Sequence, residues 1–254
     1  METKIKKRYH LIDELRGFAV FCMVFYHAFY LMAYSFNIKI GTAFFNFFTP
    51  VQPIFAALFI FLSGISCFLT RSNLARGLKL LGVSLGVTFV TCYLLPLFSM
   101  DGFAIYFGVL HLLSCGMLLV ALFKPLILKI PTLYGLPITF ALFLLTYNVQ
   151  NGFLGTELFG FNLPKVLYKT NNLFFLGFYN NTFTSADYFP LLPWIFMFFA
   201  GAFVGRLEAK GKFPTFFEKS YMPAFKFLGK HALIIYLVHQ PLIFGLITFL
   251  RMVF

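Results

Sequence analysis

Long apolar stretches alternate with short polar connections along the whole chain, and this pattern predicts the fold class. Seven stretches contain no Asp, Glu, Lys or Arg: 17–36, 51–69, 80–98, 104–123, 132–147, 190–205 and 232–250. A bilayer core about 30 Å thick needs roughly 20 apolar residues in a helix, and most of these stretches reach that length. Because the backbone in hydrocarbon must satisfy its own hydrogen bonds, we expect α-helices. The sequence therefore predicts an all-α, polytopic bundle of about seven transmembrane helices.

The composition excludes an ordinary water-soluble fold. Of the 254 residues, 60% are hydrophobic, 21% are aromatic and only 11% are charged, whereas a soluble domain carries about 25% charged residues. The first apolar stretch follows basic residues, as in a secretory signal, but it is too long and lacks a small-residue cleavage pattern. We expect it to be retained as the first helix.

The positive charge of the chain predicts an orientation. With the N-terminus in the cytoplasm and seven helices, the basic residues outside are Lys39, Lys165, Lys169 and Arg251, and the remaining 16 of the 20 Lys and Arg lie inside. This asymmetry is typical of cytoplasmic loops and places the C-terminus outside. The opposite orientation of seven-helix receptors and retinal proteins argues against those classes. Topology and attraction to the bilayer account for most of the basic excess, so no nucleic-acid partner is expected.

We expect one transmembrane domain over residues 1–254, with an ordered external cap at 148–189 that is rich in Asn and aromatic residues. The four cysteines all lie in apolar stretches without a CxxC pair. They are expected to be buried small hydrophobes, and neither disulfides nor a metal site is predicted.

Polar side chains inside apolar helices are the best indicators of function, because they tend to face a cavity or a partner. His27 follows Arg16 by 11 residues, which is about 16 Å along a helix and brings both onto nearly the same face. Asp13 can pair with Arg16 at the cytoplasmic end of this stripe; the alternative is that Asp13 only favours the helix N-terminus. The alternative is that His27 only forms a hydrogen bond to a neighbouring helix.

Three further polar residues in or beside the predicted helices are candidates for catalysis. His111 lies within the stretch 104–123, and a structural hydrogen bond across helices is the alternative reading. His239 stands two residues before Pro241, which frees a backbone carbonyl and favours a polar cavity. Asp187 is a carboxylate at the external mouth of the sixth stretch, where simple solvation is the alternative.

A second polar row follows the second stretch. Gln52, Ser63, Ser66 and Thr70 recur at helical spacing, and Arg71 ends the row. Together with the Arg16 stripe this row predicts a cleft, in which Asp13, Arg16, Ser63, Ser66 and Arg71 are candidate ligands for a cofactor. Back-bonding of the hydroxyls to their own helix is the alternative.

The run from Arg8 through Asp13, Arg16 and Gly17 to His27 resembles the transmembrane acyltransferase superfamily, and most of all the bacterial branch of the heparan-alpha-glucosaminide N-acetyltransferase family. Four later segments support the likeness: 61–66 (FLSGIS), 108–111 (GVLH), 187–194 (DYFPLLPW) and 227–241 (FLGKHALIIYLVHQP). The resemblance covers nearly the whole chain. It implies an integral protein of the bacterial cell (inner) membrane that moves an acetyl group from cytoplasmic acetyl-CoA to an external amino-sugar or hydroxyl acceptor, without a metal.

The resemblance further implies His27 at the transfer point, with Arg16 and Asp13 at the cofactor entrance. Animal members carry an asparagine in place of His27 and use a histidine farther along, whereas segment 37–50 here contains none. They also have more helices, so this chain would lack part of the acceptor site or complete it as a homo-oligomer. A neutral imidazole in this position can serve as base or nucleophile.

Two other classes of function compete with an acetyltransferase. A transporter or channel would use the polar rows for permeation, but no Asp or Glu lies in the seven stretches and no matched broken helices mark inverted repeats. A non-catalytic assembly protein would use the histidines structurally. Binding of CoA would separate the first class from the other two.

Overall fold

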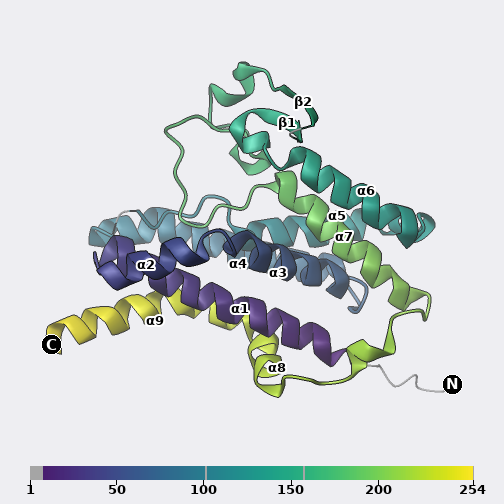
Figure 1. Cartoon of the computed structure of the whole chain (residues 1–254), viewed down its shortest axis with the longest axis horizontal. Helices are drawn as coiled ribbons and strands as arrows, with labels where there is room; N and C mark the ends of the chain where they lie inside the picture. The colour runs from purple at the N-terminus through teal and green to yellow at the C-terminus, as the bar shows by residue number, and fades with distance from the viewer. Residues whose placement is uncertain (1–7, 101, 157, 254) are drawn as a thin grey trace. The chain divides into compact units, whose positions relative to one another are not determined.

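The computed structural model describes residues 8–100, 102–156 and 158–253, and most of these residues are helical (Figure 1). The α-helices are α1 (His10–Tyr30), α2 (Lys39–Phe48), α3 (Gln52–Ser66), α4 (Asn73–Phe89), α5 (Val109–Lys129), α6 (Thr132–Thr146), α7 (Leu191–Ala209), α8 (Pro223–Lys230) and α9 (Ala232–Val253). The strands are β1 (Phe153–Thr156) and β2 (Phe159–Asn162). The all-α prediction is confirmed.

Six helical segments in the described residues are long and apolar enough to cross a membrane. They are His10–Ser35, Asn73–Phe98, Val109–Lys129, Thr132–Asn151, Leu191–Ala209 and Ala232–Val253. The helices α2 and α3 pass the same test together, although the pair is bent by 58°. Counting that pair as one span gives seven, which agrees with the polytopic bundle predicted from the apolar pattern.

The helices divide into two compact units. Unit 1 comprises residues 1–62 and 214–254, and unit 2 comprises residues 63–213. Unit 1 therefore joins both ends of the chain, with α1, α2, most of α3, α8 and α9. Unit 2 holds α4 to α7 and the two strands.

Unit 1 is built on a close crossing of α1 and α8. A Cβ atom at Gly17 would overlap the Phe225 carbonyl oxygen, and one at Gly229 would overlap the carbonyl oxygen of Asp13. Small residues at such crossings let two helix backbones approach closely. Aromatic side chains beside the crossing add further contacts between the two helices. The Phe225 ring lies edge-on to Phe18 with centroids 5.6 Å apart. This crossing fixes the eight-residue α8 against the first membrane span.

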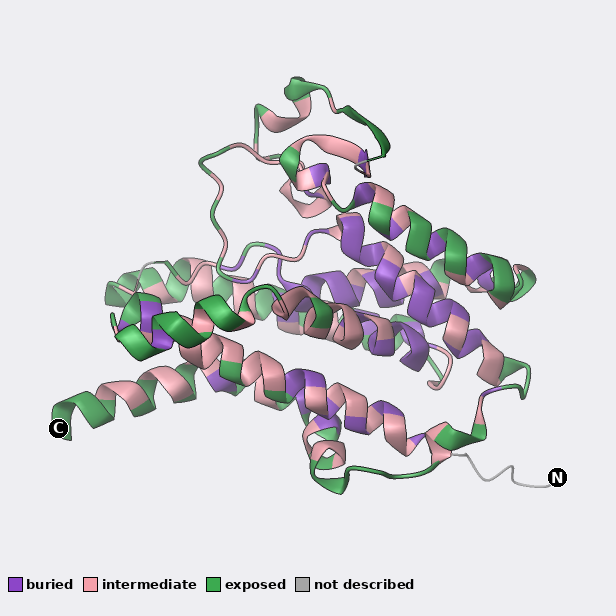
Figure 2. Cartoon of the chain, in the orientation of Figure 1, coloured by how far each residue is buried: buried purple, intermediate pink, exposed green. Residues whose placement is uncertain are grey.

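The core of unit 2 lies between α5 and α7, which carry most of its buried residues (Figure 2). Gly116 leaves room for the ring of Phe198, and Gly135 leaves room for the ring of Phe203. The helices α4 and α6 flank this pair, since α4 packs on α5 and α6 packs on α7. The outward faces of both flanking helices are apolar, which suits contact with lipid.

Several helix ends differ from the sequence prediction. The stretch expected to be helical from 104 begins its helix only at Val109, so His111 lies in the first helical turn. Residues 104–107 instead run beside 186–189, where Ala186 N–H donates to the Ala104 carbonyl (2.8 Å) and Phe189 N–H to that of Phe107 (3.1 Å). The helix of the second stretch, α3, ends at Ser66, so Thr70 lies beyond it.

The segment from 148 to 189 contains no long helix among its described residues. It forms short 3-10 turns and the antiparallel pair β1–β2, in which Gly155 lies opposite Gly160. Gly155 has φ of 135°, and a side chain there would overlap the Phe159 carbonyl oxygen. Glycine is therefore required at this position.

Candidate active site

His27 lies on α1 in unit 1 and faces a histidine from the other end of the chain. Its ring centroid is 5.0 Å from that of His239 on α9. The Nδ1 atom of His27 is 3.0 Å from the Met23 carbonyl oxygen. Because a carbonyl oxygen only accepts, Nδ1 carries the hydrogen, and the lone pair of the neutral ring lies on Nε2. His27 can therefore act as a base or nucleophile through Nε2.

His239 has the same arrangement within its own helix. It is buried, and its Nδ1 lies 2.7 Å from the Tyr236 carbonyl oxygen, so Nδ1 again carries the hydrogen. Pro241 lies within α9 and has no N–H to donate to the Leu237 carbonyl. The structure thus brings together two imidazoles that were predicted separately and are distant in sequence.

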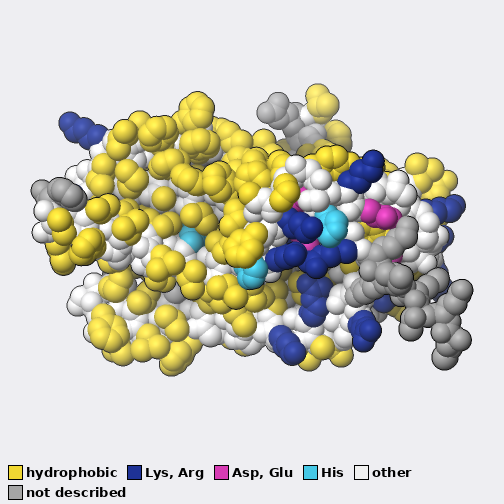
Figure 3. Space-filling view, turned by 90° about the horizontal axis from the view of Figure 1, so that it is seen from below, with side chains coloured by type: hydrophobic (Ala, Val, Ile, Leu, Met, Phe, Trp, Pro, Cys, Tyr) yellow, Lys and Arg dark blue, Asp and Glu magenta, His cyan; other side chains and the backbone are white. Residues whose placement is uncertain are grey.

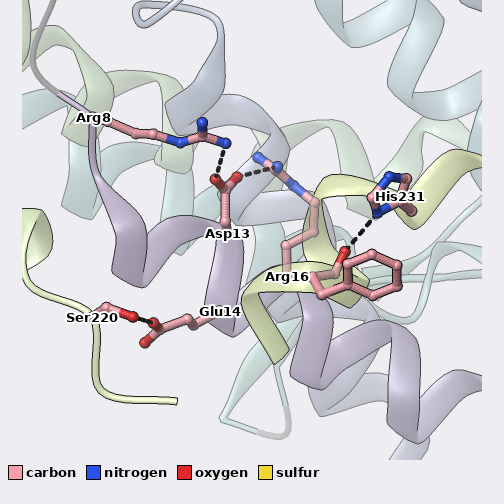
Figure 4. Close-up of polar contacts among 7 residues, drawn as sticks. Arg8, Asp13, Glu14, Arg16, Ser220 and His231 are labelled. Carbon is pink, nitrogen blue, oxygen red and sulfur yellow. Dashed lines mark hydrogen bonds and ion pairs between the residues drawn. The ribbon is translucent and has the colours of Figure 1, made fainter. Parts of the chain in front are cut away.

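Asp13 and Arg16 form an ion pair one turn into α1, as the three-residue spacing suggested. Arg16 Nη1 lies 3.2 Å from Asp13 Oδ1, and Arg8 Nη2 lies 3.2 Å from Asp13 Oδ2 (Figure 4). The carboxylate thus bridges two guanidinium groups and orients Arg16. Such pairs at a water boundary add little stability, so their value here is the placement of positive charge.

The helix α8 adds a second group of basic side chains beside this ion pair. The close contact of Gly229 with the Asp13 carbonyl brings the neighbouring Lys230 and His231 next to α1, and Figure 4 shows His231 beside Arg16. Lys226 lies one turn earlier on α8 and interacts electrostatically with Glu14. Figure 3 shows Lys and Arg side chains gathered around a histidine near one end of an otherwise largely apolar face.

Glu14 is a functional element that the sequence did not single out. Its side chain is 0% exposed and accepts hydrogen bonds from the Ser220 hydroxyl and from Tyr221 N–H (2.9 Å) (Figure 4). A buried carboxylate needs such partners, because an unpaired charge is costly to bury. Glu14 therefore ties the segment before α8 to α1 and fixes where the basic side chains of α8 lie. In the sequence, the one feature that could have pointed to Glu14 is its position next to Asp13 in a chain with few acidic residues.

His111 in unit 2 is held by hydrogen bonds at both ring nitrogens. Gly108 N–H donates to Nδ1 (3.2 Å), so the ring hydrogen lies on Nε2, which is 3.2 Å from Thr88 Oγ1. The Thr88 hydroxyl donates onward to the Ile105 carbonyl (2.8 Å). These hydrogen bonds hold the connection between α4 and α5 against both helices.

Asp187, also in unit 2, lies beside the same N-terminal turn of α5. Its Oδ2 accepts from Val109 N–H at 3.0 Å, at the N-terminus of α5. A Cβ atom at Gly108 would overlap this carboxylate, so glycine permits the contact. A carboxylate is favourable there because the helix dipole presents positive partial charge and N–H groups. Asp187 thus joins the segment 186–189 to α5.

The remaining predicted residues line the end of α3 and the connection after it. Ser63 and Ser66 are buried on α3, and Arg71 is exposed in the bend before α4. The thiol of Cys67 donates to the Ser63 carbonyl at 3.6 Å. Of the predicted set, unit 1 holds Asp13, Arg16, His27 and His239, whereas unit 2 holds Ser63, Ser66, Arg71, His111 and Asp187.

Arg206 is a buried cation in the last turn of α7. It donates to the Leu128 carbonyl (3.0 Å from Nη2) and to Thr132 Oγ1 (3.2 Å from Nη1). These bonds satisfy the carbonyl end of α5 and hold the α5–α6 connection on α7. The predicted apolar stretch ended at residue 205, whereas α7 continues to Ala209, so this position was not expected to lie within a helix.

Comparisons with known proteins give one match. A family model described as "Heparan-alpha-glucosaminide N-acetyltransferase, catalytic" matches residues 8–241. No curated protein and no solved structure matches the chain. Among the residues that the structure describes, no group of three or more His, Cys, Asp or Glu could hold a metal ion. The match includes every candidate residue described above and spans both units, so the chain belongs to the heparan-alpha-glucosaminide N-acetyltransferase family.

Proposed function

We propose that this membrane acetyltransferase takes its acetyl group from acetyl-CoA on the cytoplasmic side and delivers it to an amino-sugar or hydroxyl acceptor on the external side. The family and the apolar helices support membrane acetyl transfer. The observation that carries the proposal is the His27–His239 pair on α1 and α9, whose centroids are 5.0 Å apart. Both rings carry hydrogen on Nδ1, so His27 Nε2 is the basic atom that the reaction needs.

The donor is proposed to bind with its phosphate groups at the α1–α8 end of unit 1. Arg16, Lys226, Lys230 and His231 gather positive charge and hydrogen-bond donors there, and charge-assisted bonds to phosphate are the strong kind. Moving phosphate into hydrocarbon would be costly. The thioester on its long, thin arm would instead extend along the α1 face toward His27, about 16 Å away at helical rise.

In the direct route, the acceptor oxygen or nitrogen attacks the thioester carbonyl while His27 Nε2 takes the acceptor proton. The new acyl bond forms, the C–S bond breaks, and the proton passes to the leaving CoA thiolate. In the covalent route, Nε2 attacks the carbonyl first, the C–S bond breaks, and the leaving CoA thiolate takes up the proton from Nδ1. The acceptor then attacks the acetyl-imidazole, the N–C bond breaks, and the acceptor proton passes to the imidazole. Release of one thiol per protein without acceptor would distinguish the covalent route.

The candidate residues of unit 2 would contact the donor or position the N-terminal turn of α5. Arg71, Ser63 and Ser66 would contact the donor from α3 and its following bend. His111 and Asp187 are proposed as positioning residues, since their polar atoms hold the N-terminal turn of α5. We further propose one functional domain over 1–254 with an external cap at 148–189, in a bacterial inner membrane, with a homo-oligomer completing the acceptor site.

Binding of CoA to purified protein tests the proposal against a transporter or an assembly protein. We expect saturable CoA binding in detergent and acetyl transfer to an amino sugar in vesicles. Loss of transfer in His27→Ala with CoA binding retained would support the site, whereas no CoA binding to the folded wild type would refute the function. Sidedness is tested by cysteine labelling from outside, which should modify a reporter at Asn172 and not one at Lys212.

A further inference from the structure

The segment that follows α6 exposes an apolar surface that the acetyl-transfer site does not use. Four large apolar side chains, here called the hairpin surface, are Leu158, Phe159, Phe161 and Val166, which are 92%, 65%, 59% and 63% exposed. Phe159 pairs with Thr156 and Phe161 with Leu154, so both rings lie on the same face of the β1–β2 pair. A contiguous exposed apolar surface of this kind marks an interaction site.

The place of the hairpin in the chain indicates what covers this surface. The apolar span that contains α6 ends at Asn151, and β1 begins at Phe153 and packs on α6. Figure 1 shows the two strands at the end of α6. The outward residues of α6 are apolar and exposed up to its end, including Phe140, Leu144 and Tyr147. The hairpin surface therefore lies next to the exposed apolar residues of a candidate membrane span.

The charges nearby fit the same partner. Lys165 and Lys169 lie exposed in and just after the 3-10 turn that follows β2. The one acid in the sequence from 153 to 169 is Glu157, which lies outside the described residues, and the segment has net positive charge. Aromatic rings beside lysines at the end of a span are typical of the bilayer interface, where the lysine stems cover apolar surface and the ammonium groups reach phosphate.

We propose that the hairpin surface is a membrane anchor. Phe159 and Phe161 insert among the upper acyl chains of the leaflet in which α6 ends, and Lys165 and Lys169 contact the lipid phosphates. An isolated pair of strands is marginally stable in water, and burial of one apolar face against lipid supplies what a third strand would otherwise provide. The anchor holds the cap segment beside the bundle.

Depth-dependent quenching of a tryptophan tests this anchor in the full-length protein. The chain has one Trp, Trp194, which is buried and gives a constant background. The variant Phe161→Trp adds a reporter on the hairpin surface, and Asn172→Trp adds a matched reporter at an exposed cap position. Each is reconstituted into phosphatidylcholine vesicles with or without bromine on the upper acyl carbons.

We expect brominated lipid to remove most of the emission added by Phe161→Trp and little of that added by Asn172→Trp. Leu158→Trp serves as a second reporter on the same surface if Phe161→Trp does not fold. Emission at 161 that acrylamide quenches and bromine does not would place the surface in water. Emission that neither quencher reaches would place it against protein, such as a second copy of the chain. Either result would overturn the proposal.

Discussion

His27 in unit 1 and His111 in unit 2 both lie in apolar helices, yet their ring nitrogens are used in different ways. His27 donates through Nδ1 to a carbonyl of its own helix and keeps its lone pair on Nε2, and its ring lies beside that of His239. His111 accepts at Nδ1 from Gly108 N–H and donates through Nε2 to the Thr88 hydroxyl, so both of its nitrogens are used in structural hydrogen bonds. The hydrogen bonds therefore distinguish two histidines that the apolar pattern alone treats alike: His27 keeps Nε2 for other contacts, whereas both ring nitrogens of His111 hold neighbouring groups.

The largest effect expected from this comparison is in His27→Ala. Loss of a positioned base or nucleophile removes about 10²–10⁴-fold of rate, and we expect acetyl transfer to fall within that range while CoA affinity is unchanged. Steady-state turnover of purified protein and titration with CoA measure the two effects. Turnover like that of the wild type would remove His27 from the mechanism.

His239→Ala is expected to reduce turnover less than His27→Ala, by about 10–100-fold, because we propose His27 as the base or nucleophile and His239 lies beside it, with ring centroids 5.0 Å apart. The conservative variant His239→Asn keeps a polar side chain at this buried position and serves as its control. A rate in His239→Ala lower than that in His27→Ala would reverse the two roles within the pair.

Removing charge at the α1–α8 end should affect donor affinity and spare the catalytic step. We expect Arg16→Ala and Lys230→Ala each to weaken CoA binding about tenfold, which corresponds to about 1.4 kcal/mol. Arg71→Ala tests the proposed contribution of unit 2 in the same titration at fixed salt. Lys165→Ala, which changes a lysine of the cap, is the matched control. Unchanged affinity in both Arg16→Ala and Lys230→Ala would place the donor phosphates elsewhere.

The smallest effect on turnover is expected in unit 2. His111→Ala leaves Gly108 N–H and the Thr88 hydroxyl without their ring partner, which costs about 1–3 kcal/mol of stability. We therefore expect a lower melting temperature and a turnover within a few-fold of the wild type when measured well below it. Thr88→Val should lower the melting temperature in the same direction. A stable His111→Ala protein without activity would make His111 catalytic and remove the distinction between the units.

The apolar pattern predicted the spans well because lipid imposes both helical structure and length on them. It placed the start of α5 too early, since residues 104–107 are apolar but lie outside the helix, where they accept two backbone hydrogen bonds from 186–189. Periodicity does not separate a short apolar extended segment from a helix. Only contacts with a distant segment decide this boundary.

In the candidate site, too, local spacing predicted some contacts, whereas contacts between distant segments could not be predicted. The Asp13–Arg16 pair could be predicted because three residues along a helix bring two side chains together. The approach of His239 to His27 depends on how α9 packs on α1, which no local spacing encodes. Glu14 was missed for a similar reason, because its partners Ser220 and Tyr221 come from the far end of the chain.

The assembly of unit 1 from both ends of the chain has a consequence for synthesis. Ribosomes release α1 first and α9 last, so the two imidazoles cannot meet until nearly all of the protein has entered the membrane. The order of translation thus delays assembly of the histidine pair, and a chain truncated before α9 should insert without becoming an active enzyme.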